Sequence, residues 1–482
     1  MASAIETETA PAREPRQNPR RYLVLAICCS SLFIVGLDNT IVNVALPTMR
    51  EDLHASIPEL QWTVDAYTLV LASLLILSGS TADRLGRARI FKVGLALFTL
   101  GSLLCSLAPS VELLIAFRML QAIGGSMLNP VAMSIIRNTF TNARERAQAI
   151  GVWGGVIGLS MALGPVLGGA LVEGIGWRSI FWVNVPVGLA VIVLTARYVA
   201  ESRAPHARRP DPVGQVLVLV ILASVTYAII EAPEAGWLSS QTLGLFALSA
   251  AALGALVLYE PRRRDPLIEL RFFRSAPFSG ATLIAVSAFL ALSGFLFLNT
   301  LYLQQARGLS PLEAGLYMLP MAVTTVVVGP LSGRAVGRVG SRPSLLLGGA
   351  GIAIGALMLT GVTPTTPHAW LIAAYVIFGL GFGAVNPPIT NTAVSGMPPA
   401  QAGVAAAIAS TSRQVGASLG IALVGAVGVA SSGGPAALAA AGHTGWWIVA
   451  LCGALVVLLA FVTTTRAALD TAMAVGGLEA EA

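Results

Sequence analysis

The chain has 482 residues, of which 55% are hydrophobic and only 11% charged, and its mean hydropathy is +0.78. A water-soluble domain carries about twice that share of charged residues, so the composition excludes a soluble globular protein and indicates a chain surrounded by the bilayer. The net charge of +6 comes almost wholly from arginines in many short connectors, which excludes a nucleic-acid-binding domain and is typical of loops that stay in the cytoplasm.

The chain begins with a polar segment, residues 1–21, whose prolines and arginines predict a disordered cytoplasmic tail. No short hydrophobic core with a small-residue cleavage site follows, so the first span is expected to be a retained anchor. Apolar stretches of about 20 residues, long enough to cross a bilayer as helices, then recur to the end of the chain. We place fourteen spans at 22–46, 61–82, 90–109, 112–136, 148–172, 179–200, 212–231, 241–259, 277–302, 312–333, 344–362, 369–395, 403–430 and 444–465. This even number predicts an all-α, multi-pass protein of the cell membrane with both termini in the cytoplasm.

A charged turn, residues 79–89, separates the second and third spans. Its charged side chains cannot lie in hydrocarbon, and its arginines place it at the cytoplasmic face. Gly86 allows the backbone to reverse sharply. The positions of interest are Gly79, Asp83, Arg84, Gly86 and Arg87. Taken alone, this pattern indicates only a positively charged connector between membrane helices.

The pattern of this turn recurs at residues 333–340, between the tenth and eleventh spans, with Gly337 in place of the aspartate. The repeat predicts two six-helix halves that face each other across a midplane cavity, which is an alternating-access design. The predicted parts are a tail at 1–21, an N-terminal half at 22–200, an inserted helix pair with cytoplasmic linkers at 201–276, a C-terminal half at 277–465 and a cytoplasmic tail at 466–482.

Three charged residues lie well inside the first four spans, away from the span ends, and each is a candidate for function because charge is costly in hydrocarbon. The helical rise puts Asp38, Asp65 and Arg118 about 12, 6 and 9 Å below the outer ends of their spans, so an Asp–Arg contact is feasible. Such a pair could be a fixed structural element, or an aspartate could load and release a proton as the contact changes. Asp65 lies near Trp62 and Tyr67, so it could instead attract a cationic, partly aromatic substrate or be only an interfacial acid.

Other polar residues in the spans are weaker candidates for substrate binding. Gln121 shares a helical face with Arg118. Asn386 precedes two prolines that are expected to break the twelfth span, and broken helices line cavities in transporters. Arg413, near the middle of span thirteen, could neutralise an anionic substrate or cap freed carbonyls. The full set is Asn39, Asn43, Trp62, Tyr67, Gln121, Asn386, Asn391 and Arg413.

The fifth span carries small residues at helical spacing and ends in Gly-Pro-x-x-Gly-Gly. Glycines let helix backbones approach closely, and a proline frees a carbonyl and bends the helix. The positions of interest are Gly158, Gly164, Pro165, Gly168 and Gly169. Glycine packing by itself is common in membrane proteins.

These motifs together resemble a known family. The turn at 79–89 resembles the signature loop of the major facilitator superfamily, where it is implicated in gating the inward face. The ending of span five resembles the antiporter motif of drug exporters in that superfamily. Runs at 37–47, 177–188, 302–320 and 413–420 are similar to the fourteen-span drug:proton antiporters, which export quaternary ammonium dyes and antibiotics.

This resemblance covers about residues 22–465 and implies efflux of hydrophobic, cationic drugs or antibiotics, driven by the proton gradient with no cofactor. It implies that Asp38 and Asp65, with Arg118, carry the coupling. Some cation-exporting members also have acids in spans ten and thirteen. This chain has Glu313 only at the mouth of span ten and Arg413 in span thirteen, which leaves the breadth of polycation transport open.

Other functional classes find little support. An ATP-driven pump needs a lysine before Ser or Thr in a phosphate loop, whereas Lys92 is the only lysine and precedes a valine. Residues 416–420 match Gly-x-Ser-x-Gly but lie in an expected membrane helix, and the histidines are scattered, so no catalytic residue or metal site is predicted. We expect a monomer whose partners are a small-molecule substrate, protons and lipid. An uptake symporter, or a carrier for one metabolite, is the main alternative.

Overall fold

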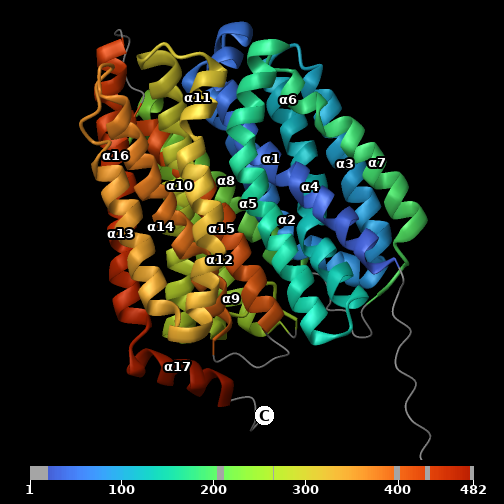
Figure 1. Ribbon diagram of the computed structural model, residues 1–482. Coiled ribbons are helices and arrows are strands. Elements are labelled where there is room, and N and C mark those ends of the chain that lie inside the picture. The colour runs from blue at the N-terminus through green and yellow to red at the C-terminus, as the bar shows by residue number, and fades with distance from the viewer. Residues whose placement is uncertain (1–19, 204–210, 264, 396–401, 429–434, 478–482) are drawn as a thin grey trace, which may run out of the picture.

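The computed structural model describes residues 20–203, 211–263, 265–395, 402–428 and 435–477, and every regular element in these ranges is a helix. The predicted tail at 1–21 falls almost wholly outside them. Long helices run side by side through the bundle, with the early helices on one side and the late helices on the other (Figure 1).

The N-terminal side of the bundle has its own apolar core. Its elements are α1 (Arg21–Leu53), α2 (Ile57–Leu85), α3 (Arg87–Ser106), α4 (Val111–Thr139), α5 (Ala143–Gly174), α6 (Ser179–Trp182) and α7 (Asn184–Tyr198). Polar caps begin two of these helices, because the hydroxyls of Ser56 and Ser110 accept hydrogen bonds from backbone N–H groups in the first turns of α2 and α4. Buried side chains such as Phe91 and Phe98 fill the space between the helices.

The inserted pair and the C-terminal side follow. The pair is α8 (Pro212–Ala235) and α9 (Ser240–Tyr259), followed by the turns η1 (Glu260–Arg262) and η2 (Leu270–Arg274). The C-terminal side comprises α10 (Ala276–Leu301), the π-helical turn η3 (Tyr302–Ala306), α11 (Pro311–Tyr317), α12 (Leu319–Val339), α13 (Ser341–Leu357), α14 (His368–Val394), α15 (Ala402–Gly428) and α16 (Pro435–Thr463). Its core includes Phe295, stacked on Phe378 with ring centroids 4.2 Å apart.

Part of the predicted C-terminal tail is helical. Residues 466–477 form α17 (Arg466–Gly477), which lies across the base of the bundle (Figure 1). Ala468 and Ala472 are buried, and Thr471 accepts a hydrogen bond from the backbone N–H of Ala276 at 2.9 Å. Helix α17 is therefore packed against the start of α10.

Twelve helical stretches of the described chain are long and apolar enough to cross a membrane, so the chain is a multi-pass membrane protein. They match twelve of the predicted spans. The spans predicted at 344–362 and 403–430 contain α13 and α15, which do not meet that standard. Helix α13 has 17 residues, and α15 carries Arg413 and Gln414 near its middle. The prediction of fourteen spans is therefore not confirmed.

Hydrogen bonds join the two sides of the bundle at the end that carries α6 and α11, the upper end in Figure 1. We call this the far end, and the end that carries α17 the terminal end. Gln61 of α2 donates to the carbonyl of Ile421 on α15 at 3.0 Å. Gln304 donates to the carbonyl of Val44 on α1 at 2.8 Å, from a π-helical turn that departs from the regular α-helical register. The bundle is therefore held closed at the far end.

The predicted break in the twelfth span is wrong, because α14 continues through Pro387 and Pro388. A proline has no N–H, so Pro388 leaves the carbonyl of Ala384 without its helical hydrogen bond. Ser332 of α12 donates its hydroxyl to that carbonyl at 2.7 Å. The neighbouring helix thus replaces the missing donor, and the helix continues.

Candidate functional site

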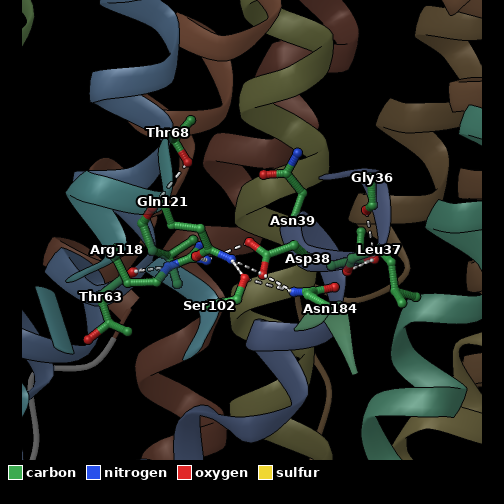
Figure 2. A network of polar contacts seen from close by, with 12 residues as sticks. Gly36, Leu37, Asp38, Asn39, Thr63, Thr68, Ser102, Arg118, Gln121 and Asn184 are labelled. Atoms are coloured by element: carbon green, nitrogen blue, oxygen red, sulfur yellow. Dashed lines mark hydrogen bonds and ion pairs between the residues drawn. The ribbon is translucent and has the colours of Figure 1, made fainter. Parts of the chain in front are cut away.

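Asp38 of α1 lies at the centre of a buried polar network, on which Arg118, Gln121 and Asn184 converge (Figure 2). Arg118 Nη1 donates to Asp38 Oδ2 at 2.5 Å, and both side chains are at most 1% exposed. The amide groups of Gln121 and Asn184 donate to Asp38 Oδ1 at 2.8 and 3.1 Å. Both oxygens therefore accept hydrogen bonds, and the bond from Arg118 is charge-assisted.

Arg118 has partners on every side. Its Nε donates to the carbonyl of Thr63 at 3.1 Å, and its Nη1 also donates to Gln121 Oε1 at 2.7 Å. The guanidinium carbon lies 4.1 Å from the centroid of the Tyr67 ring, which adds a cation–π contact. The depths estimated from the helical rise did not decide which aspartate forms an ion pair with Arg118. In the structure the partner is Asp38.

Two members of this network were missed from the sequence. Ser102 of α3 accepts from Gln121 at 2.7 Å and from Asn184 at 3.4 Å. Asn184, the first residue of α7, could have been identified from the sequence, because it is an amide near the start of an apolar span. Ser102 could not have been identified in this way, because small polar residues are common in membrane helices.

Asp65 of α2 is as deeply buried as Asp38, but its surroundings differ. Within the described part of the chain, neither of its carboxylate oxygens has a hydrogen-bond partner. Ser418 of α15 comes near without hydrogen-bond geometry, and its hydroxyl lies 3.5 Å from that of Thr226 on α8. Gln61, one turn earlier on α2, is bonded to α15. Asp65 therefore faces the contact between the two sides of the bundle.

The glycine-rich α5 lies between α1 and the C-terminal side. A Cβ at Gly164 would come 1.9 Å from Thr40 Oγ1, two residues beyond Asp38, so only glycine fits against α1 here. A Cβ at Gly169 would come 2.4 Å from the carbonyl oxygen of Pro311 at the start of α11. The other predicted positions make related contacts: Gly158 with Val326, Pro165 with Gly315, and Gly168 with Ile41. The motif thus connects the helix of Asp38 to the other side of the bundle.

The charged turn is shorter than predicted, because α2 continues through Asp83 and Arg84 to Leu85 and α3 begins at Arg87. Gly86 stands alone between them at φ +119°, a conformation that favours glycine. Asp83 and Arg87 form an ion pair at 2.8 Å across the turn. Arg84 is exposed, and Gly79 faces Pro130 of α4.

Glu201, which follows α7, holds this turn in place. Its carboxylate accepts hydrogen bonds from the backbone N–H groups of Ala88 and Arg89, each at 3.0 Å. The first N–H groups of a helix have no partner within the helix and carry partial positive charge, so an acid is favourable there. The sequence reading missed Glu201, because its partners are more than a hundred residues away.

A family model described as Major Facilitator Superfamily matches residues 28–421. The chain belongs to the Major Facilitator Superfamily. This family consists of transporters, so the chain is a transporter and not an enzyme. Its fold is similar to that of a bacterial homologue of the human lysosomal transporter Spinster in an inward-facing and occupied conformation, with a TM-score of 0.65, 18% identity and coverage of 95% of this chain and 98% of that one.

Relatives of higher identity are named for drug resistance. The chain is 37% identical over 410 residues to the multidrug resistance protein Stp of Mycobacterium tuberculosis, a match that covers 85% of this chain and 76% of that protein. It is 36% identical over 427 residues to the methylenomycin A resistance protein of Streptomyces coelicolor, a match that covers 88% of each chain. One name refers to many drugs and the other to one compound.

The amide candidates in this facilitator chain do not gather at one place. Asn39 points away from the Asp38 network (Figure 2), and its carbonyl accepts from Asn43 at 3.2 Å. Asn391 donates to the hydroxyl of Ser341 at 3.0 Å, and Asn386 is half-buried on α14. Only Gln121 joins Asp38 and Arg118 directly.

Arg413 of α15 is a half-buried cation whose hydrogen bonds go to hydroxyls rather than to freed carbonyls. Its Nη2 donates to Thr390 Oγ1 at 2.6 Å, and its guanidinium carbon lies 5.9 Å from the centroid of the Phe289 ring. In the described ranges, no acidic side chain forms an ion pair with it, and its Nε has no hydrogen-bond partner.

No group of three or more His, Cys, Asp or Glu side chains that could hold a metal ion occurs in the part of the chain that is described. Transporters of this family generally need no cofactor.

Proposed function

We propose that this chain exports hydrophobic, cationic drugs or antibiotics across the cell membrane in exchange for protons, as a fourteen-span drug:proton antiporter. The observation that carries the proposal is the buried Asp38–Arg118 pair in a chain whose relatives are resistance proteins. Ionisable groups in membrane helices are costly and mark proton or substrate pathways. The Gly-Pro-x-x-Gly-Gly ending of α5, which resembles the antiporter motif of exporters, supports export over uptake.

The proposed topology has both termini and the turn at 79–89 in the cytoplasm, and the transporter acts as a monomer in lipid. Helices α13 and α15 complete the fourteen spans. Close packing supports this, because a Cβ at Gly416 of α15 would come 2.3 Å from the carbonyl oxygen of Val286 on α10, and one at Gly348 of α13 would come 2.8 Å from the side chain of Val385 on α14. With this topology the far end, where Gln61 and Gln304 join the two sides, faces outward.

The proposed division of the chain is a half at 22–200, an inserted pair at 201–276 and a half at 277–465. Apolar packing supports it, because one buried cluster is built from residues between Val24 and Val191 and another from residues between Phe272 and Ala460. A third cluster joins the halves, because Phe297, Leu301 and Ile421 pack with residues of the N-terminal half. Two units that each keep a large core of their own can rock against each other at this contact without unfolding, as alternating access requires.

Asp38 is proposed to exchange the proton. Protonation would remove the negative charge that holds Arg118 and would loosen α1 from α4. Val44, about 9 Å further along α1, is hydrogen-bonded to Gln304 on the other side of the bundle. A shift of α1 would therefore reach the seal at the far end, and the contact of α1 with Gly164 would transmit it to α5.

Asp65 is proposed to recognise the positive charge of the substrate. A buried carboxylate with no partner is costly, so the site favours either a proton or a cationic group on the carboxyl.

A second candidate function is export of one compound that carries an acidic group. Arg413 favours it, because no described acid pairs with its charge. The methylenomycin A resistance protein, named for a single compound, is compatible with a dedicated carrier.

Both functions can be tested in proteoliposomes with an imposed pH gradient. We expect the wild type to move ethidium only when the gradient is present, and Asp38→Asn to lose this movement. Asp470→Asn, which changes an exposed acid on α17, is the matched control and should transport normally. If the wild type moves no dye, the multidrug proposal is wrong, and gradient-driven transport of organic anions, lost in Arg413→Gln, would support the second function.

A further inference from the structure

The inserted helix α8 contacts both sides of the bundle. Near the terminal end, Gln215 of α8 is hydrogen-bonded to the carbonyl of Ser73 on α2. Further along, Thr226 of α8 contacts Ser418 of α15. Towards the far end, the indole N–H of Trp62 on α2 donates to Glu231 Oε1 at 3.3 Å. Helix α8 therefore covers the seam between α2, which carries Asp65, and α15.

An acid and two aromatic rings lie together where α8 covers this seam. The rings of Trp62 and Tyr227 are 5.6 Å apart at an angle of 46°, so they form an open corner rather than a stack. Tyr227 is exposed, and Trp62 and Glu231 are half-buried. Glu231 lies about 6 Å from the end of α8 by the helical rise, within the outer part of a membrane span.

Glu231 is an acid without a cation. None of the ion pairs in the described ranges includes it, and its one hydrogen bond comes from a neutral indole. A carboxylate at this depth is costly unless it binds a positive charge. The sequence reading passed over it, because Glu231 stands at the very edge of the predicted span 212–231.

Asp65 lies directly behind this corner. It is three residues beyond Trp62 on α2, and Ser418, which comes near it, contacts Thr226, the neighbour of Tyr227 on α8. Its carboxyl group is fully buried, and no described group hydrogen-bonds to it. A second acid without a partner is thus placed on the inner side of the same seam.

We propose that the α2–α8–α15 seam holds a binding site for a lipophilic organic cation, formed by Trp62, Tyr227 and Glu231 on the membrane side with Asp65 behind them. The aromatic faces attract the cation through their quadrupoles, and Glu231 supplies the counter-charge. Because α8 forms part of this site, the inserted pair contributes to substrate recognition. This inference rests on the proposed function, since it gives the exporter a cation site that opens to lipid.

The test measures equilibrium binding of tetraphenylphosphonium to the full chain in lipid nanodiscs. Glu231→Gln keeps the shape of the side chain and an acceptor for Trp62 but removes the charge. We expect its Kd for the cation to rise about five- to tenfold, and the Kd for neutral triphenylphosphine oxide to stay unchanged. Glu234→Gln, an exposed acid on the same helix, is the matched control and should bind like the wild type.

Tyr227→Leu provides a second variant, which removes the aromatic corner without touching an acid, and should also weaken cation binding. An unchanged Kd in both Glu231→Gln and Tyr227→Leu, or no binding of the cation by the wild type, overturns the site. Wild-type dye transport in proteoliposomes is measured in parallel. If the wild type transports dye and the variants bind the cation with unchanged Kd, this inference alone is rejected. If the wild type transports no dye, the proposed function is rejected, and the Kd values of the variants still decide whether the site exists.

Discussion

Asp38 and Asp65 are both fully buried acids in the N-terminal side, yet their surroundings are opposite. Asp38 accepts hydrogen bonds from an arginine and two amides, all from its own side of the bundle. Asp65 has no such partner among the described residues and faces α15 on the other side. The first acid is tied into one unit, and the second lies at the junction of two.

This difference separates two tasks that one acid could not perform equally well. An acid within a saturated network responds to a proton by rearranging its neighbours, so it can drive a helix movement. An acid without partners binds whatever positive group arrives, so it can select a substrate. The comparison therefore predicts that the two positions fail in different ways when they are changed.

The largest effect is expected for Arg118→Leu. It leaves Asp38 buried without a counter-charge, and we expect a loss of about 3–5 kcal/mol in the free energy of unfolding in detergent, together with loss of transport. Arg178→Leu is the control, because Arg178 pairs with Asp52 where both are over 40% exposed, and should cost at most about 1 kcal/mol.

The double variant Asp38→Asn/Arg118→Leu sharpens this result. It removes both charges, so most of the lost stability should return while proton-driven exchange stays absent. Recovery of exchange along with stability would mean that the pair is only a structural element. A single Arg118→Leu variant as stable as the wild type would show that Asp38 needs no counter-charge.

A smaller effect is expected for Gly164→Ala, which displaces α1 near Asp38 and changes neither acid. The new methyl group would overlap Thr40, so we expect a cost of about 1–3 kcal/mol and slower proton-driven exchange. Cation binding at Asp65 should not change. Gly151→Ala on the same helix, where a Cβ meets nothing within 4 Å, is the control. Equal effects of the two substitutions on exchange would break the proposed link between α5 and Asp38.

Composition and helical rise were enough to predict the helices and the similar depths of Asp38 and Arg118, because both follow from the bilayer thickness and from backbone geometry. Contacts between helices could not be derived in this way. Asn184 reaches Asp38 only because α7 packs beside α1, and Ser102 joins the network through Gln121 and Asn184 because α3 packs beside α4 and α7. The continuous α14 depends on a donor from α12, which no local pattern reveals. Residue type and depth in the membrane can be predicted from a sequence, but which side chains contact each other depends on how the helices pack.

The smallest loss of stability is expected for Asp65→Asn, and it is the most direct test of the comparison. No described hydrogen bond is broken, so the free energy of unfolding should change by less than about 1 kcal/mol, whereas Asp38→Asn should cost more. Selectivity should change instead, because an amide cannot neutralise a cation. Proteoliposomes with Asp65→Asn should lose transport of ethidium and keep transport of an uncharged substrate. A large loss of stability would mean that Asp65 is tied into the fold as Asp38 is, and the division between a coupling acid and a recognition acid would then fail.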